Sequence, residues 1–457
     1  MPDPHQPLLL AGATLVTLDA EAGILHQDLL LEDGRIAAFG PAAVPVGTRR
    51  LDVAGCLVLP GLIQGHVHLG QTLFRGLAEG RRLMRWLGER IWPLEAAHDD
   101  DSAYWSGLLG AAECLLSGTT TIQEIGLGPG APGLVRAIET AGLRGFAGPC
   151  LMDEADGLPA GLATDTDAAL AGADELGARL GAAGGRLRPA LNPRFLLSCS
   201  PALWRGTVEL ASARGWPVHT HALEQADEGE LVRARFGRDE IGVFEDLGLL
   251  DLDLRIAHGV QLTADHRRRV SGRRFSVCTC PGSNLKLGSG IADLVGLREA
   301  RIPVSVGADG PPCNNDLDVL EEVRLAALLQ TLRHGPAAFS GRDALRLATS
   351  EGARALGLDD LVGSIELGKR ADLVVLGSDR PELFPLTEDA DPGGLRADLH
   401  DLVVYGASRA SVRHVIVDGE PLVADGRLLH LDLQEIRREA KRALRELLRR
   451  ARIPAGA

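Results

Sequence analysis

One short stretch of this chain constrains its fold more than any other. Residues 60–68 read Pro-Gly-Leu-Ile-Gln-Gly-His-Val-His, an apolar run that ends in His66 and His68. Side chains at positions i and i+2 of a β-strand point to the same side, so a strand that ends here presents both imidazoles to one point. A His-x-His pair taken alone is more often two surface histidines near a turn, and the downstream sequence has to decide between the two interpretations.

Strand-like apolar runs alternate with helical stretches rich in Ala, Leu, Glu and Arg over residues 59–363. The runs lie at residues 118–122, 187–191, 217–221, 254–258 and 304–307. Strands that alternate with helices over so long a segment favour parallel βα units that close into a barrel. We therefore predict an α/β protein whose parallel βα units close into a barrel.

The two ends of the chain differ from residues 59–363, because short strand-like runs predominate there. Residues 8–18 and 29–39 predict short antiparallel strands, and residues 371–376, 402–405 and 412–417 predict more strands near the other end. Asp418-Gly419 predicts a tight turn after the last of these. We expect the two β-rich ends to form one domain together, followed by a helix over residues 433–452.

Composition limits the classes of partner. The chain has 457 residues, 45% of them hydrophobic, and a formal net charge of −14, which repels phosphate backbones and anionic lipid. No nucleic acid and no membrane is expected as a partner. The seven cysteines are scattered and odd in number, and the first residues lack the basic region of a signal peptide. A cytoplasmic location is the prediction.

Four polar side chains follow the ends of predicted strands. They are His221, Glu224, His258 and Asp309. Because the C-terminal ends of parallel barrel strands meet at one rim, these groups and the histidines of residues 66–68 should converge. Nitrogen and oxygen ligands without a thiolate cluster suit a catalytic zinc ion with an open position, and a metal beside a carboxylate is typical of hydrolases.

Each of these residues alone has a simpler explanation. His221 or His258 singly is more often a core or loop histidine, and Asp309 before Gly310 is more often a turn residue. It is their order and spacing together that predicts a metal site.

The chain resembles the amidohydrolase superfamily, in its deaminase and chlorohydrolase branch. The resemblance covers nearly the whole chain, and its motifs lie at residues 60–68, 73–76, 91–95, 118–121, 221–224, 257–259, 280–287, 307–310 and 363–373. It implies a distorted (β/α)8 TIM barrel over residues 59–363 and a small β-sandwich built from residues 1–58 and 364–431. A C-terminal helix at residues 432–457 would follow, in a homodimer or homotetramer.

The resemblance also implies roles for the residues of the rim. One divalent metal, usually zinc and sometimes iron, would be held by ligands that correspond to His66, His68, His221 and Asp309. Glu224 resembles the proton shuttle, and His258 the histidine that polarises the hydrolytic water. Asp309 would share in the proton transfers as well as hold the metal.

The lysines bear on the metal count. Binuclear members of the superfamily bridge their metals through a carboxylated lysine or a carboxylate on a middle strand, and here the only lysines are Lys286, Lys369 and Lys441. None lies on a predicted central strand, so one metal is expected. Glu124 as a bridging carboxylate is the alternative.

The reaction implied is hydrolytic deamination of an aminated heterocycle, with water and the heterocycle as reactants and ammonia as a product. Glu95 and the loop at residues 309–315 are similar to deaminases of adenosine-type nucleosides, namely 5′-deoxyadenosine, methylthioadenosine and S-adenosylhomocysteine. Gln71, Arg194 and Phe195 are similar to positions with which guanine deaminases hold an oxopurine. The closer match lies with the nucleoside deaminases.

Three alternatives stay open from the sequence. They are a guanine or 8-oxoguanine deaminase, an s-triazine or pterin amino- or chlorohydrolase, and a binding protein that keeps the metal as scaffold. Thr279 stands where relatives usually carry histidine, so contacts in the pocket can differ from theirs.

Overall fold

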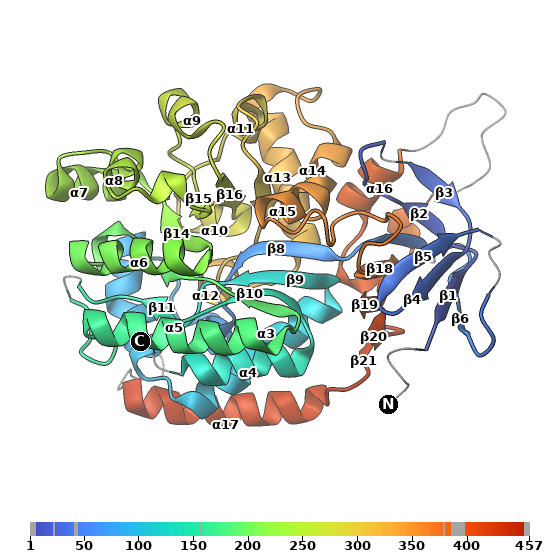
Figure 1. Ribbon diagram of the computed structural model, residues 1–457, viewed down its shortest axis with the longest axis horizontal. Coiled ribbons are helices and arrows are strands. Elements are labelled where there is room, and N and C mark those ends of the chain that lie inside the picture. The colour runs from blue at the N-terminus through green and yellow to red at the C-terminus, as the bar shows by residue number, and fades with distance from the viewer. Residues whose placement is uncertain are drawn as a thin grey trace. The chain divides into compact units, whose positions relative to one another are not determined.

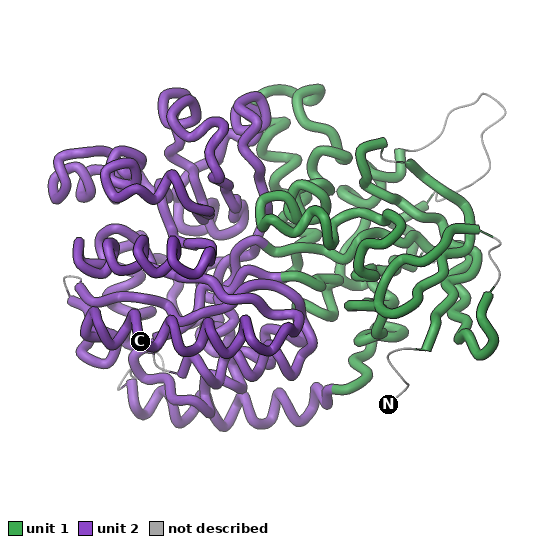
Figure 2. The backbone as a smooth tube through the Cα atoms, in the orientation of Figure 1, with its two compact units in different colours: residues 1–64, 113–121, 318–430 green, residues 65–112, 122–317, 431–457 purple. Residues whose placement is uncertain are grey.

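The structure is a computed structural model, shown in Figure 1, and it describes residues 6–21, 23–40, 44–128, 130–154, 157–377, 380–384 and 398–451. The chain divides into two compact units (Figure 2). Unit 1 comprises Met1–Gln64, Glu113–Thr121 and Asp318–His430, and unit 2 comprises Gly65–Ala112, Ile122–Leu317 and Leu431–Ala457. Each unit is described by itself.

Unit 1 contains a seven-stranded sheet that draws strands from both ends of the chain. Its order is β21-β20-β19-β18-β7-β2-β3. The strands are β2 (Thr14–Val16), β3 (Ile24–His26), β7 (Leu57–Pro60), β18 (Leu373–Leu376), β19 (Val412–Val417), β20 (Glu420–Ala424) and β21 (Arg427–Leu428). β18 pairs antiparallel with β7, so segments more than three hundred residues apart in sequence lie side by side.

A four-stranded sheet of order β5-β4-β1-β6 completes the strands of unit 1. Its members are β1 (Leu8–Ala11), β4 (Leu29–Glu32), β5 (Arg35–Phe39) and β6 (Arg49–Asp52). β1, β4 and β5 are antiparallel neighbours, which confirms the strands predicted near the N-terminus. One apolar cluster joins side chains of both sheets, including Leu10, Leu29, Val58, Leu373 and Ile416.

The predicted turn at Asp418-Gly419 connects β19 and β20. Both residues have positive φ, at 58° for Asp418 and 77° for Gly419, which is the backbone that a two-residue hairpin loop needs to match the twist of its strands. Val417 pairs with Glu420 across this loop. The turn prediction is confirmed.

The strand predicted at residues 402–405 is wrong, because this segment is helical. α16 (Leu399–Gly406) begins after Asp398, whose side chain accepts a hydrogen bond from the backbone N–H of His400. Its buried residues are His400, Val403 and Val404. Spacings of three and four residues place them on one helical face, and this periodicity outweighs the strand propensity of two adjacent valines.

Two four-stranded sheets carry the strands predicted for the barrel region. Their orders are β12-β10-β9-β8 and β14-β15-β16-β17. The strands are β8 (Leu62–Val67), β9 (Thr119–Glu124), β10 (Arg144–Ala147), β12 (Leu187–Pro189), β14 (Val218–Ala222), β15 (Leu254–His258), β16 (Phe275–Thr279) and β17 (Val304–Val306). The pairs β14–β15, β15–β16 and β16–β17 are parallel. A short parallel pair, β11 (Cys150–Leu151) with β13 (Asn192–Pro193), accompanies them.

Two isolated parallel bridges lie at the outer strands of these sheets. Val67 pairs with Asp309, and Leu191 pairs with Val218. Gly65 of β8 has no space for a side chain, since a Cβ there would lie 2.0 Å from the Oγ of Ser305 in β17. The first and last of the parallel strands therefore approach each other closely within unit 2.

Helices alternate with the parallel strands as the pattern predicted, and further helices belong to unit 1 (Figure 1). They are η1 (Leu69–Phe74), α1 (Leu83–Trp86), η2 (Leu87–Ile91), α2 (Trp92–Ala96), α3 (Asp100–Leu116), α4 (Ala131–Ala141), α5 (Thr166–Ala183), η3 (Leu196–Ser198), α6 (Pro201–Arg214), α7 (Ala226–Phe236), α8 (Glu240–Asp246), η4 (Leu249–Asp251), α9 (Ala264–Val270), α10 (Pro281–Lys286), α11 (Leu294–Glu299), α12 (Pro311–Asn314), α13 (Val319–His334), α14 (Gly341–Leu347), α15 (Ser350–Ala355), η5 (Pro381–Leu383) and η6 (Arg409–Ser411). None of the described helices is long and apolar enough to cross a membrane.

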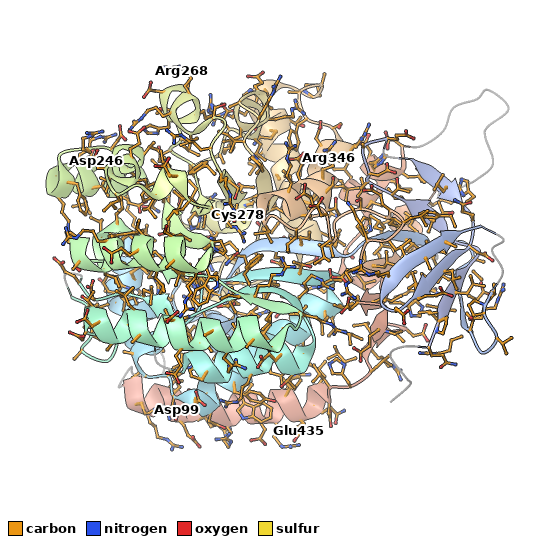
Figure 3. All side chains as sticks on the ribbon, in the orientation of Figure 1. Asp99, Asp246, Arg268, Cys278, Arg346 and Glu435 are labelled. Atoms are coloured by element: carbon orange, nitrogen blue, oxygen red, sulfur yellow. The ribbon has the colours of Figure 1, made fainter. Side chains whose placement is uncertain are left out.

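The predicted C-terminal helix is present as α17 (Leu433–Ala451) in unit 2. Its buried residues, Ile436, Ala440, Ala443 and Leu447, recur at helical spacing and join an apolar cluster that includes Trp92 and Leu94 of α2. Ion pairs border this contact, among them Arg450 with Asp99 at 2.9 Å. Asp99 and Glu435, both labelled in Figure 3, lie on the side of unit 2 that carries α17.

Truncation of α17's apolar face should destabilise unit 2. Leu447 is fully buried, and we expect Leu447→Ala to cost about 2–5 kcal/mol of unfolding free energy through lost apolar contact and the cavity left behind. Arg449→Ala, at an exposed position of the same helix, is the control and should change it by less than about 0.5 kcal/mol. Thermal and urea unfolding measure both, and equal stability of the two variants would refute the packing described.

Candidate active site

His66 and His68 meet Asp309 where β8 ends. The Nε2 atom of each histidine lies 3.3 Å from Oδ1 of Asp309. The backbone holds this arrangement, because the N–H of Asp309 donates to the carbonyl of His66 at 3.2 Å. Both imidazoles are buried, and the same-side placement expected for positions i and i+2 is present.

His221 of β14 completes a set of converging ligand atoms. Its Nε2 lies 3.0 Å from Nε2 of His68. Single ligand atoms of His66, His221, His258 and Asp309 also lie within 4.8 Å of one another. A tetrahedral zinc ion with bonds of about 2.0–2.1 Å holds its ligand atoms about 3.3 Å apart. The separations of 3.0 to 3.3 Å at this site fit such an ion.

Hydrogen bonds behind the histidines fix which nitrogen faces the site. His219 Nδ1 lies 3.1 Å from the carbonyl oxygen of Arg255, which can only accept, so this nitrogen carries the proton. His219 Nε2 then accepts from His66 Nδ1 at 2.8 Å. His66 Nε2 is left with a free lone pair, and it is buried without a hydrogen-bond partner among the described residues. A buried histidine nitrogen that has a free lone pair and no hydrogen-bond partner is suited to bind a metal ion.

A backbone carbonyl group also fixes which nitrogen of His221 faces the site. Its Nδ1 lies 2.6 Å from the carbonyl oxygen of Arg194, so Nδ1 donates and Nε2 faces the site as an acceptor. Burial lowers the pKa of His66, His68 and His221 below the ordinary histidine value. Neutral rings, the form that binds a metal, are therefore favoured.

Glu224 and His258 lie beside this cluster. Glu224 Oε2 is 3.6 Å from His258 Nε2, and that nitrogen is 4.0 Å from Asp309 Oδ2. Burial raises the pKa of Glu224 to about 7. A carboxyl group that titrates near neutrality can both accept and return a proton in one catalytic cycle.

Three polar residues of the site were not assigned a role from the sequence. Asn284 Oδ1 accepts from His258 Nδ1 at 3.0 Å, and the hydroxyl of Ser283 donates to Asp309 Oδ2 at 2.6 Å. His219 orients His66 as described above. A signal existed for His219, since it precedes His221 by two residues and shares its face of β14. Ser283 and Asn284 lie on α10, where only the spatial arrangement reveals their partners.

Two side chains of the site, those of His258 and Asp309, extend from strained backbone. His258 has a φ of 73° and Asp309 a φ of 63°. Left-handed backbone at non-glycine residues is uncommon and concentrates at functional sites. Here it occurs at the two strand ends that carry the groups facing Glu224.

The residues that the sequence predicts to bind substrate lie close together. They are Gln71, Glu95, Arg194 and Phe195. Arg194 pairs with Glu95 at 2.6 Å, and the amide of Gln71 donates to the other oxygen of Glu95 at 2.7 Å. All three are at most 3% exposed. Features that pointed to two different substrates in the sequence thus form a single hydrogen-bonded network. Phe195 follows Arg194 and is also buried.

A cavity adjoins this network. It is lined by His68, Leu83, Trp86, Leu87, Arg194, Phe195, His221, Glu224, Glu228, His258, Leu287 and Asp309. Its polar wall is formed by the three histidines, by the guanidinium group of Arg194 and by the three carboxyl groups of this set, and the remaining wall is apolar. An uncharged aromatic ring with one polar edge fits such a surface.

Glu124, the alternative bridging ligand, is occupied elsewhere. Its two carboxyl oxygens accept hydrogen bonds from the backbone N–H groups of Leu69 and Gly126, at 2.9 and 3.1 Å. Lys286 is also bound away from the cluster, with Nζ 2.8 Å from Glu79.

The model of the amidohydrolase family matches residues 57–422. The chain belongs to the amidohydrolase family. The resemblance inferred from the sequence motifs is confirmed. Members of this family are metal-dependent hydrolases, in agreement with the ligand cluster of this amidohydrolase.

Relatives match this amidohydrolase over nearly its full length. A 5-methylthioadenosine/S-adenosylhomocysteine deaminase of Natronomonas pharaonis is 38% identical, with 97% of this chain and 99% of the relative covered. A 5′-deoxyadenosine deaminase of Methanosarcina acetivorans is 33% identical with the same coverage of both chains. The crystal structure of an adenosine deaminase from Xanthomonas campestris with bound zinc aligns with a TM-score of 0.88 at 31% identity, covering 98% of this chain and 99% of that one.

Removal of one ligand should weaken metal binding in this amidohydrolase. We expect His221→Ala to lower zinc affinity by at least about 100-fold, because one coordinating nitrogen is lost from a preformed set. Competition with a zinc-binding dye measures the affinity. His334→Ala, on an exposed face of α13, is the matched control and should bind as the wild type does. Wild-type zinc affinity in His221→Ala would contradict the site.

A second prediction concerns His98, which ties down the helix that follows His68. Its Nε2 donates to the carbonyl of Gly70 at 2.9 Å, and burial lowers the pKa of His98 to about 4 from 6.5. Between these two values the unfolded chain binds the extra proton. The contribution of His98 is therefore fully present above pH 6.5 and is lost as the pH falls towards 4.

At pH 5 this loss amounts to about 2 kcal/mol. We expect His98→Gln, assayed without metal, to lose less unfolding free energy than the wild type when the pH is lowered from about 7.5 to 5. His334→Gln should lose as much as the wild type. An acid dependence that His98→Gln leaves unchanged would show that His98 is not the titrating group.

Proposed function

We propose that this chain is a metal-dependent aminohydrolase that deaminates an aminated purine, an adenosine-type nucleoside such as 5′-deoxyadenosine, methylthioadenosine or S-adenosylhomocysteine. The observation that carries the proposal is the buried carboxyl of Glu224, with a pKa of about 7, beside His258 and the ligand cluster. Relatives named as deaminases of these nucleosides, at 33 to 38% identity, support the substrate class.

One divalent ion, zinc or alternatively iron, would be held by His66, His68, His221 and Asp309. When bound, it supplies Lewis acidity and lowers the pKa of water at the site. Both oxygens of Glu124 are taken by backbone N–H groups, which supports a single metal rather than a bridged pair.

The protein's own groups then move the protons. Glu224 takes a proton from the attacking water and delivers it to the ring nitrogen next to the carbon that carries the amino group. Burial alone would lower the pKa of His258, but the carboxylates of Glu224 and Asp309 outweigh it and raise that pKa. Protonated His258 stabilises the negative charge on the oxygen that adds to the ring carbon, and Asp309 helps to pass a proton to the departing ammonia. Water and the amine thus become an oxopurine and ammonia.

The names of the relatives support a nucleoside rather than a free oxopurine as substrate. Gln71 and Arg194 bind Glu95 through Gln71 Nε2 and one N–H of Arg194, and Arg194 also lines the cavity. We propose that Glu95 accepts hydrogen bonds from the ribose hydroxyls, that Arg194 and Gln71 hold it in place, and that Phe195 packs against the nucleoside.

We also infer that the parallel strands close into the distorted (β/α)8 barrel at residues 59–363. The bridges Val67–Asp309 and Leu191–Val218 support closure, because they connect the two four-stranded sheets at both of their outer edges. The β-sandwich of residues 1–58 and 364–431, the helical segment at residues 432–457, the homodimer or homotetramer and the cytoplasmic location stay predictions.

Replacement of Glu224 tests the function directly. In zinc-loaded protein we expect Glu224→Gln to reduce ammonia release by about 10²–10⁴-fold, since the amide cannot shuttle a proton, while the zinc content stays that of the wild type. Glu230→Gln, at an exposed position of α7, is the matched control and should be fully active. Full activity of Glu224→Gln would contradict the mechanism.

A substrate panel tests the class. We expect ammonia from adenosine, 5′-deoxyadenosine, methylthioadenosine and S-adenosylhomocysteine, and little from guanine, 8-oxoguanine or melamine. Glu95→Gln should raise KM for the nucleosides by about 10-fold or more, because an acceptor of ribose hydroxyl groups is weakened. Turnover of guanine alone would transfer the substrate role to Gln71 and Arg194.

A further inference from the structure

Two buried carboxyl groups that the mechanism does not use lie against the backbone that carries Glu224. Glu228 belongs to α7 and Glu240 to α8, and they are 3% and 2% exposed. Burial raises the pKa of both. Carboxyl groups buried this deeply are costly unless their oxygens are used, so their contacts indicate what they do.

Three consecutive backbone N–H groups around Glu224 bind these carboxyl groups. Glu240 Oε2 accepts from the N–H of Leu223 at 2.6 Å, and Glu228 Oε2 accepts from the N–H of Glu224 at 3.0 Å and of Gln225 at 3.5 Å. The segment after β14 is thus held from two different helices. It presents its one long acidic side chain, Glu224, to the cavity.

The segment needs such support because its backbone is strained. Leu223 has a φ of 57°, and left-handed backbone at a non-glycine residue persists only where its surroundings enforce it. A hydrogen bond from a backbone N–H to a buried carboxyl oxygen is favourable, and its loss would leave the N–H buried without a partner. The bonds to Glu240 and Glu228 therefore favour the turn that directs Glu224 towards His258.

The side chain of Gln225 anchors the other side of the same segment. Its amide donates to the carbonyl of Leu287 and to the hydroxyl of Ser289, both at 3.2 Å. The Ser289 hydroxyl in turn lies 3.4 Å from Glu224 Oε1. Hydrogen bonds therefore hold both the backbone and the carboxyl group of Glu224.

A helix cap is the simpler explanation for Glu228. It occupies the third position of α7, where a glutamate commonly accepts the N–H of the residue before the helix. Here, however, the shorter bond goes to Glu224 rather than to Gln225, and Glu228 also lines the cavity. Glu240 makes an equivalent bond from a different helix, which a cap of α7 does not explain.

We infer that Glu228 and Glu240 are positioning residues, which fix the carboxyl group of Glu224 for proton transfer by holding the backbone of residues 223–225. This inference rests on the proposed function, in which Glu224 is the proton shuttle. It goes beyond that function because it assigns to both residues a role exerted through the backbone of residues 223–225.

The test compares variants that keep the hydrogen-bond acceptor with variants that remove it. Glu228→Gln and Glu240→Gln retain an acceptor oxygen, and we expect kcat within about 5-fold of the wild type. Glu228→Leu and Glu240→Leu remove it, and kcat should fall by about 10²-fold, the effect of a displacement of about 1 Å at a reacting group. KM for 5′-deoxyadenosine and the zinc content should stay within about 2-fold of the wild type. Glu230→Leu on the exposed face of α7 is the control.

A loss of thermal stability in the leucine variants with kcat unchanged would mean that the two glutamates only cap helices, and would overturn the inference. If a leucine variant does not fold, Glu228→Asp replaces it, because a shorter carboxylate still suits a helix start but reaches the N–H of Glu224 less well. We expect kcat to fall about 10-fold in Glu228→Asp at unchanged KM, and unchanged kcat would again overturn the inference.

Glu224→Gln, assayed in parallel, separates the two hypotheses. An active Glu224→Gln would refute the proposed function itself. An inactive Glu224→Gln beside fully active variants at positions 228 and 240 would refute only the positioning role.

Discussion

The contact between the end of β8 and Asp309 is the interaction on which the rest of the site depends. A parallel bridge joins Val67 to Asp309, and through it the Nε2 atoms of His66 and His68 reach the same carboxylate oxygen at 3.3 Å. The first of the parallel strands and the last are thereby fixed to each other at the point where both carry ligands. A shift at this bridge would separate two histidines from their carboxylate, so the backbone pairing and the chemistry depend on each other.

A second feature of the site is that main-chain carbonyl groups set the states of its side chains. Arg194 orients His221, and Arg255 orients His219, which in turn orients His66. A carbonyl oxygen can only accept, so His66 and His221 are left with a free Nε2 lone pair directed into the site, while His219 Nε2 accepts from His66. Because burial favours neutral rings, the fold alone gives these two histidines the form that a metal ion would bind.

Much of this could be predicted from the sequence. The His-x-His pair, the segments that end at His221, His258 and Asp309, and the resemblance to amidohydrolases predicted which residues converge at the site and which segments form parallel strands, because such signals are local in the chain. The prediction of a strand at residues 402–405 is wrong because it rests on the strand propensity of two adjacent valines. The helical spacing that decides the structure starts at His400, before the predicted segment.

Other features depended on the way distant segments come together. The salt bridge between Glu95 and Arg194 joins residues 99 positions apart, and it unites side chains that had suggested two different substrates. The support of Glu224 by Glu228 and Glu240 was likewise hidden, since a glutamate in the first turn of a helical stretch looks like an ordinary solvated charge. Burial and hydrogen-bond partners, which no sequence pattern reports, distinguish such residues.

We propose that a single metal ion, held by His66, His68, His221 and Asp309, makes the chain a deaminase. The most direct test is a titration of metal-free protein with zinc in which bound zinc and the rate of ammonia release from 5′-deoxyadenosine are measured on the same samples. We expect the rate to rise in proportion to bound zinc and to reach its plateau at one zinc per chain. Ammonia release from metal-free protein, or a plateau reached only at two zinc ions per chain, would contradict the account.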